Sequence, residues 1–129
     1  MNASAMRYSP RVLELFAELP GAGSLPAGNG EIVAGEAVAL DRGAWVRFEA
    51  RLEGGRIADC RFRAWGCPYT LAAAALVTAE LRAGPEARSQ VIDASRLARE
   101  LGAPAEKMGR FLVVEDALRS LLARGRRVQ

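Results

Sequence analysis

The residues of this sequence whose type and spacing could support chemistry lie in the run 62–77, FRAWGCPYTLAAAALV. Gly66 lets an extended chain turn sharply, and Pro68 suits the first turn of a helix, so Cys67 stands at the mouth of a predicted helix. Free amide N–H groups and the helix dipole favour an anion at that place, and a thiol there tends toward the nucleophilic thiolate form. A thiol that is simply packed at a tight strand–helix corner accounts for the same pattern equally well.

The second cysteine, Cys60, is predicted to be a small buried apolar residue. It falls between Ala58 and Phe62 on the apolar side of an alternating run. It is too far from Cys67 in the chain for a C-x-x-C redox or zinc pair. Two cysteines do not make a disulfide framework, which agrees with a reducing, cytoplasmic compartment.

The composition excludes several kinds of catalytic site. The sequence has no histidine, which removes imidazole acid–base catalysis and imidazole metal ligands. Lys107 is the only lysine, so no serine–lysine dyad is present. Glu115 and Asp116 are adjacent in a predicted helix and point about 100° apart, so we interpret them as surface charge rather than as an acid–base pair.

The composition also limits the classes of partner. The net charge is +3, and much of the excess lies in the final run ARGRRVQ, which includes Arg124, Arg126 and Arg127. A basic end after a last helix is usually solvated, and no basic stretch is interleaved with aromatic residues, so we expect no nucleic acid partner. No apolar run is long enough to cross a bilayer and the N-terminus lacks a signal-peptide layout, so we expect a cytoplasmic protein without membrane association. The 129 residues suit one domain, 1–129.

The first predicted helix spans Arg7 to Leu19, with Ser9 as its N-cap and Pro10 at its first position. Its predicted core face consists of residues at helical spacing: Val12, Leu15, Phe16 and Leu19. A loop rich in glycine and proline follows. The next run, Glu31 to Leu40, is ambiguous, and we interpret it as an edge strand.

Two alternating runs, Trp45 to Leu52 and Arg56 to Trp65, predict a hairpin that turns at Glu53 to Gly55. Its predicted buried face consists of Val46, Phe48, Ala50, Leu52, Ala58, Cys60, Phe62 and Ala64. Its predicted wet face consists of Arg47, Glu49, Arg51, Asp59, Arg61 and Arg63.

Three more helices are predicted, over Pro68 to Arg82, Asp93 to Leu101 and roughly Pro104 to Ala123. Strands come first and helices afterwards, without the regular alternation of a parallel sheet. The pattern therefore predicts an α+β fold, in which a small antiparallel sheet of about three strands is covered on one face by helices and the first helix packs alongside.

Beyond these patterns, the run 56–81, RIADCRFRAWGCPYTLAAAALVTAEL, resembles the core of the IscU/NifU-type iron–sulfur cluster scaffold proteins. In that family a hairpin strand leads into an aromatic-Gly-Cys corner and a helix of small residues. The run 8–25, YSPRVLELFAELPGAGSL, is similar to the family's opening helix and turn. The run 97–123, LARELGAPAEKMGRFLVVEDALRSLLA, is similar to its C-terminal part. Because three separated segments match in order, the resemblance implies one IscU/NifU-like domain.

The family's function rests on three cysteines, an aspartate and a histidine, which hold a nascent iron–sulfur cluster or a zinc ion. Of the cysteines, only the middle one survives here, as Cys67. The first cysteine falls on Asp41, and the family's aspartate falls near Gly43. The histidine–cysteine pair falls on Gly109 and Arg110. The resemblance thus implies Cys67 as sulfur acceptor or ligand, with Asp41 as a harder and weaker metal ligand.

Arg110 is expected to replace the metal rather than to bind it. Its fixed positive charge stands where a metal ion would sit, and Asp41 carries the opposite charge at another former cysteine position. We therefore expect Asp41 and Arg110 to form an ion pair across the old ligand pocket, with little net gain in stability.

The resemblance implies an iron–sulfur assembly protein with a degenerate ligand set, and not an enzyme. Its implied partners are a cysteine desulfurase or an authentic scaffold, and Cys67 is the implied sulfur acceptor. Three alternatives remain open: a scaffold completed by a second chain or a small thiol, a redox protein that uses Cys67 as nucleophile or peroxide-sensing thiol, and a regulatory domain without chemistry.

Overall fold

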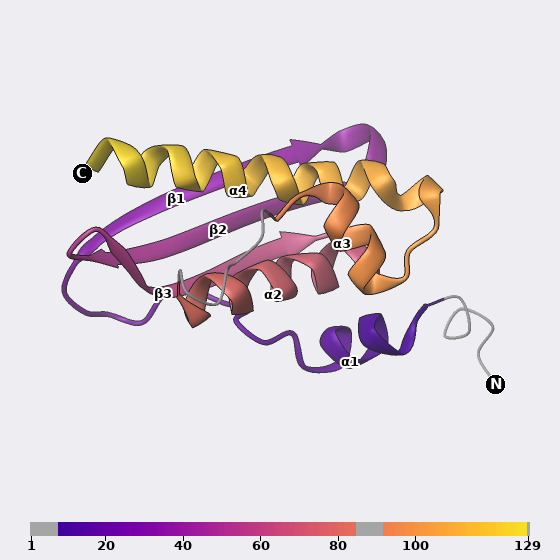
Figure 1. Cartoon of the computed structure of the whole chain (residues 1–129), viewed down its shortest axis with the longest axis horizontal. Helices are drawn as coiled ribbons and strands as arrows, with labels where there is room; N and C mark the ends of the chain where they lie inside the picture. Colours follow the sequence, from indigo (N-terminus) through magenta and orange to yellow (C-terminus); the bar gives the residue numbers. More distant parts are fainter. Residues whose placement is uncertain (1–7, 85–91, 129) are drawn as a thin grey trace.

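The computed structural model describes residues 8–84 and 92–128, which form four α-helices, two short 3-10 helices and a three-stranded sheet (Figure 1). In chain order the elements are α1 (Pro10–Glu18), β1 (Glu31–Ala39), η2 (Leu40–Arg42), β2 (Ala44–Glu53), β3 (Arg56–Trp65), α2 (Pro68–Ala83), α3 (Ala94–Leu101), η4 (Ala105–Lys107) and α4 (Met108–Val128). The predicted α+β architecture is confirmed.

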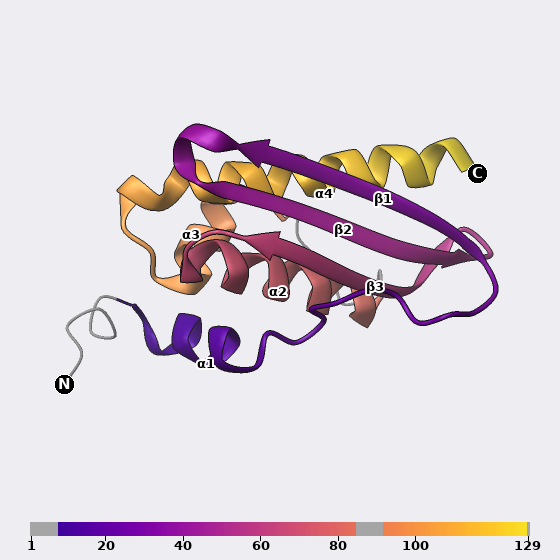
Figure 2. The same cartoon turned by 180° about the vertical axis from the view of Figure 1, so that it is seen from behind.

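The sheet has the order β1-β2-β3 with antiparallel pairing throughout. α4 packs on β1 and β2, α2 packs on β3, and α1 packs on α2. All four α-helices of the described residues lie on one side of the sheet, so none of them covers its other face, as the view from behind shows (Figure 2). The core is the layer between the sheet and the helices α2 and α4.

The start of α1 follows the predicted capping. The Ser9 side chain accepts a hydrogen bond from the Val12 amide at 3.3 Å, and its hydroxyl donates to the carbonyl oxygen of Leu101 at 2.6 Å. Arg7, the predicted first residue, lies outside the described residues. Phe16 was expected in the core but is 40% exposed, because the short helix turns only a narrow stripe toward α2 and α3.

A bulge changes the faces of β3. Arg51 pairs with Asp59 and Leu52 pairs with Ile57, which leaves Ala58 as an extra residue without a partner in β2. Ile57 consequently packs against the core while Ala58 is exposed, so the prediction of a buried Ala58 is wrong. Beyond the bulge the predicted alternation holds.

Arg51 was expected on the wet face but is only 7% exposed. Its guanidinium donates to the carbonyl oxygens of Asn29, at 3.1 Å, and of Pro26, in the loop that folds over this part of the sheet. A Cβ on Gly30 would lie 3.1 Å from the Arg51 Cγ, so a bare backbone is needed at that position. The loop hides an arginine by supplying carbonyl acceptors in place of water.

The C-terminal helices differ from the prediction in two respects. Glu115, interpreted as surface charge, is buried; its carboxylate accepts the Ala94 amide at 2.8 Å at the start of α3 and pairs with Arg119 at 2.8 Å. Pro104 precedes η4, and α4 begins only at Met108 and continues to Val128, beyond the predicted end.

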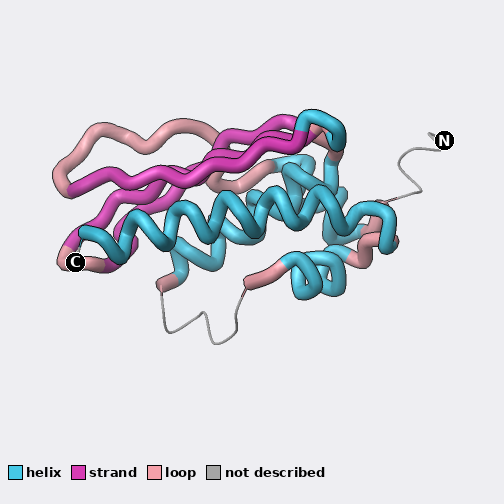
Figure 3. The backbone as a smooth tube through the Cα atoms, turned by 90° about the horizontal axis from the view of Figure 1, so that it is seen from above, coloured by secondary structure: helices cyan, strands magenta, loops and turns pink. Residues whose placement is uncertain are grey.

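Gly35 in β1 lies very close to the backbone of α4. A Cβ built on Gly35 would lie 2.6 Å from the Ala117 carbonyl oxygen and 2.7 Å from the Leu121 Cα, both of which are backbone atoms. The view from above shows α4 running beside the strands, roughly along their length (Figure 3). Because backbone atoms cannot rotate out of the way, only glycine allows this spacing.

We expect Gly35→Ala to destabilise the fold by about 3 kcal/mol, since the added methyl group must push α4 away from β1. Urea unfolding followed by circular dichroism measures the change. Gly43→Ala is the matched control, because Gly43 has a positive φ of 59° but no atom within 4 Å of its Cβ position. It should cost about 1 kcal/mol, from backbone strain alone. An equal loss in both variants would contradict the close-approach explanation.

Candidate functional site

Three segments that are far apart in the sequence meet at one end of the molecule. They are the connection between β1 and β2, the corner between β3 and α2, and the start of α4, all at the right in Figure 1 and at the left in Figure 2. The residues singled out from the sequence, Asp41, Gly43, Cys67, Gly109 and Arg110, all belong to these segments.

Cys67 is the N-cap residue of α2, with an extended backbone (φ −75°, ψ 168°). Its side chain is partly buried and does not cap the helix; its Sγ lies 3.8 Å from the Thr70 Oγ1. Gly66 allows the turn with a φ of +152°, a conformation that side chains disfavour. The strand–corner–helix geometry predicted from the sequence is therefore present, and the thiol is free.

Tyr69 joins the Cys67 corner to the start of α4. Its ring is nearly perpendicular to that of Phe111, with centroids 6.1 Å apart, and lies 5.1 Å from the ring of Tyr8. The Lys107 Nζ stands 5.8 Å from its centroid. This aromatic contact fixes the first turn of α2 against η4 and α4.

Arg42, which sequence reasoning did not single out, reaches across to α4. A Cβ on Gly109 would lie 2.5 Å from both the Cζ and the Nε of Arg42, so the guanidinium rests on the bare backbone of Gly109. Asp41, one residue earlier, is exposed in η2, and Gly43 ends η2 in the left-handed conformation. The sequence offered one indication of this contact, which was the presence of an arginine directly after Asp41 in the connection between β1 and β2.

Asp41 and Arg110 do not form the predicted ion pair. Neither residue takes part in any ion pair within the described ranges 8–84 and 92–128. The Nε of Arg110 is buried and has no hydrogen-bond partner among those residues. The prediction failed because the loop directs Arg42, not Asp41, toward the start of α4. This end of the molecule thus gathers cations from Arg42, Lys107 and Arg110.

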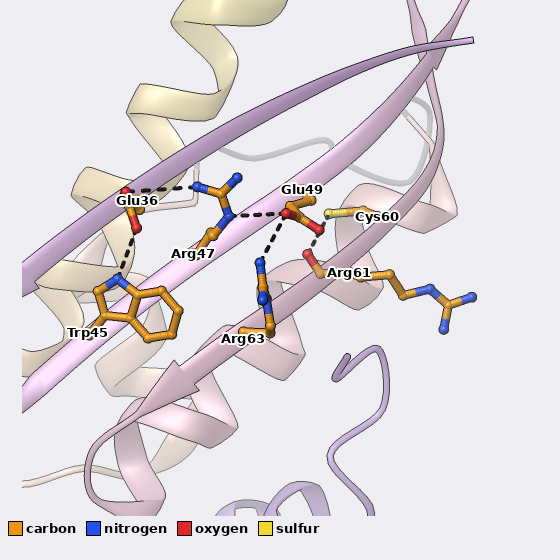
Figure 4. Close-up of polar contacts among 7 residues, drawn as sticks. All are labelled: Glu36, Trp45, Arg47, Glu49, Cys60, Arg61 and Arg63. Carbon is orange, nitrogen blue, oxygen red and sulfur yellow. Dashed lines mark hydrogen bonds and ion pairs between the residues drawn. The ribbon is translucent and has the colours of Figure 1, made fainter. Parts of the chain in front are cut away.

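Cys60 is a core residue, as predicted. It is fully buried, and its thiol lies 4.0 Å from the carbonyl oxygen of Arg61 (Figure 4). Burial, reinforced by the negative charge of Asp59, raises the pKa of Cys60 from 9.0 to about 12. Cys60 is therefore a protonated, inaccessible thiol, and of the two thiols only that of Cys67 is partly exposed.

The sequence and the fold both match a known family. The family model described as the NifU-like N terminal domain matches residues 7–125, nearly the whole chain. The chain belongs to this family. The predicted family resemblance is thereby confirmed.

Curated relatives of this NifU-like chain carry names from iron–sulfur cluster assembly. It is 26% identical to the scaffold protein IscU of Azotobacter vinelandii, over 89% of this chain and 91% of the relative. It is 28% identical to the mitochondrial iron sulfur cluster assembly protein 1 of Schizosaccharomyces pombe, where the match covers 92% of this chain but only 62% of the yeast protein. A proposed SUF-system scaffold from Fervidobacterium islandicum superposes with a TM-score of 0.61 at 17% identity, covering 94% of this chain and 98% of that one, and shows the shared fold.

The residues at this end of the molecule do not fit an iron–sulfur cluster or zinc held by this chain alone. A cluster usually takes four protein ligands, mostly thiolates. The chain has two cysteines and no histidine, and Cys60 is buried in the core. Across residues 8–84 and 92–128, no group of three or more histidine, cysteine, aspartate or glutamate residues is placed to hold a metal ion. Within the described residues this NifU-like chain therefore lacks the donor set of a cluster or zinc site. No helix within the described ranges is long and apolar enough to cross a membrane.

The raised pKa of Cys60 predicts a loss of stability at alkaline pH. The unfolded chain, with its thiol near pKa 9.0, ionises before the folded one, so the stabilisation is complete below pH 9.0 and is lost as pH rises toward about 12. Over that window the free energy of unfolding should fall by about 1.4 kcal/mol per pH unit from this group. Urea unfolding of the wild type and of Cys60→Ala at increasing pH measures the difference in slope, with Cys67→Ala as the control. Identical slopes in the wild type and Cys60→Ala would refute the prediction.

Proposed function

We propose that this protein accepts sulfur on Cys67 from a cysteine desulfurase and carries it as a persulfide, without holding a cluster. The observation that carries the proposal is that this end of the molecule keeps one partly exposed thiol, Cys67. The positions that the resemblance assigns to the family's other ligands hold Asp41, Gly43, Gly109 and Arg110. Membership of the family and the names of its relatives support a role in iron–sulfur assembly. An authentic scaffold of the same system is the expected receiver of the sulfur, and the cytoplasm is its expected compartment.

The proposed step is a sulfur exchange between two cysteines. The Cys67 thiolate attacks the outer sulfur of the protonated desulfurase persulfide, a new S–S bond forms on Cys67, and the old S–S bond breaks. The desulfurase cysteine leaves as a thiolate, and the proton stays on the transferred outer sulfur. One zero-valent sulfur atom moves, and no external oxidant or reductant is needed.

The surroundings of Cys67 support an anionic sulfur. The thiol stands at the N-terminus of a 16-residue helix, where backbone amides and the helix dipole favour negative charge. Arg42, Lys107 and Arg110 lie at the same end of the molecule. These cations disfavour a metal ion at this end of the molecule by charge repulsion.

Incubation with a cysteine desulfurase and L-cysteine should add one sulfur atom to Cys67, detected by mass spectrometry of the intact chain and of the peptide that contains it. Cys60→Ala is expected to gain sulfur as the wild type does, because Cys60 is buried. Cys67→Ala should gain none. Sulfur on Cys60, or none on a chain whose Cys67 reacts readily with iodoacetamide, would overturn the proposal.

An exposed apolar row beside Cys67 supports contact with a protein donor. Val38, Trp45 and Trp65 are in register across the three strands on the face of the sheet opposite the helices, and Leu40 follows at its end. Trp65 is 46% exposed, Val38 55% and Leu40 81%. Apolar side chains this exposed and this close together are typical of a contact surface. Trp65 is also only two residues from Cys67 in the chain, so a donor that docks on this row is held near the thiol.

Farther along the same face the charges are already paired within the chain. Glu36 accepts the Trp45 indole N–H at 3.0 Å and pairs with Arg47, and Glu49 accepts from both Arg47, at 3.1 Å, and Arg63, at 3.2 Å (Figure 4). These charged side chains already have partners within the chain, whereas the side chains of the apolar row are exposed to solvent. We therefore expect the donor to dock on the row rather than on the charges.

Leu40→Ser should slow sulfur transfer from the desulfurase about fivefold or more, because it removes a contact from the docking surface. It should leave the alkylation of Cys67 by iodoacetamide unchanged, since that reagent needs no docking. Ile32→Ser is the matched control, because Ile32 is 54% exposed at the opposite end of the same face. Equal transfer rates in the wild type and Leu40→Ser would show that the donor docks elsewhere.

A further inference from the structure

Thr70 is a buried polar residue whose hydroxyl faces the proposed sulfur acceptor. It is fully buried in the first turn of α2, three residues after Cys67, with its Oγ1 3.8 Å from the Cys67 Sγ. Among the described residues the hydroxyl has no other hydrogen-bond partner. A buried hydroxyl is costly unless it forms a hydrogen bond, so the contact with Cys67 offsets the burial of the Thr70 hydroxyl.

The position of Thr70 is tightly fixed. A Cβ on Gly66 would lie 3.0 Å from both the Cβ and the Oγ1 of Thr70, so the corner fits closely around the threonine side chain. The helix residues beyond it, Ala72 to Ala75, are wholly buried. Thr70 therefore cannot shift away from Cys67 without moving the start of α2.

We propose that Thr70 is a positioning residue that orients the Cys67 side chain and donates a hydrogen bond to its sulfur when that sulfur is anionic. In the neutral thiol either group can be the donor, because a hydroxyl and an S–H both donate and accept. A thiolate or a persulfide anion only accepts, so the Thr70 hydroxyl then becomes the donor. The functional role of Thr70 rests on the proposed sulfur transfer, whereas the contact between Thr70 and Cys67 does not.

The test replaces Thr70 by valine, which keeps the shape and removes the hydroxyl, and by serine, which keeps the hydroxyl. Thr78→Val is the matched control, because Thr78 is equally buried on the same helix about two turns farther along. The first readout is the infrared S–H stretching band of Cys67 in a Cys60→Ala background, which reports the hydrogen bond directly and needs no desulfurase. The second is the rate of sulfur transfer to Cys67.

Thr70→Val should shift the S–H band toward that of a thiol without a hydrogen bond and slow sulfur transfer about fivefold or more. Thr70→Ser should restore both properties, and Thr78→Val should change neither. An unchanged band in Thr70→Val would overturn the inference, as would a transfer rate that serine does not restore. If the band shifts but no variant, nor the wild type, takes up sulfur, the proposed function fails while the contact stands.

Discussion

The packing of the helices on the sheet depends on the close approach of β1 to α4 at Gly35. Backbone meets backbone there, within a distance that any side chain on Gly35 would prevent. Because α4 is a long helix that rests on the sheet, its contact with Gly35 also directs its first turn. That turn carries Gly109 and Arg110 to the end of the molecule where Cys67 lies. One glycine in an edge strand thus helps to set the geometry of a site formed by other segments.

Local patterns were sufficient to predict much of this fold, and long-range contacts account for the errors. The hairpin and the Ser9 cap are local, because alternation and capping depend on neighbours in the sequence. Arg51 looked like a solvated charge, but a distant loop covers it and supplies carbonyl acceptors. Glu115 also looked solvated in the sequence, but its carboxylate accepts a hydrogen bond from the Ala94 amide at the start of α3, a contact that no local pattern shows. The bulge at Ala58 could not be predicted, because the sequence of this strand alternates without a visible break.

Of the candidate site, the local corner was predicted correctly and the contacts between segments were not. The Cys67 corner could be read from a glycine, a cysteine and a proline in succession, and the structure has that corner. The pairing of Asp41 with Arg110 was inferred from opposite charges at two ligand positions, whereas the loop turns Arg42 toward Gly109. Thr70 gave no signal, because a threonine in an alanine-rich helix is ordinary until its neighbour is known. Family membership, in contrast, followed from three matching segments and is confirmed.

The measurement that tests the central claim most directly is the iron and acid-labile sulfide content of the protein after anaerobic reconstitution. The wild type and Cys67→Ala would be compared after treatment with a cysteine desulfurase, L-cysteine and ferrous iron. A site with one partly exposed thiol, in a chain without histidine, predicts no stoichiometric iron and no acid-labile sulfide in either protein. Stoichiometric iron and sulfide in the wild type that vanish in Cys67→Ala would contradict the account and show a scaffold that completes its ligands from a second chain or a small thiol.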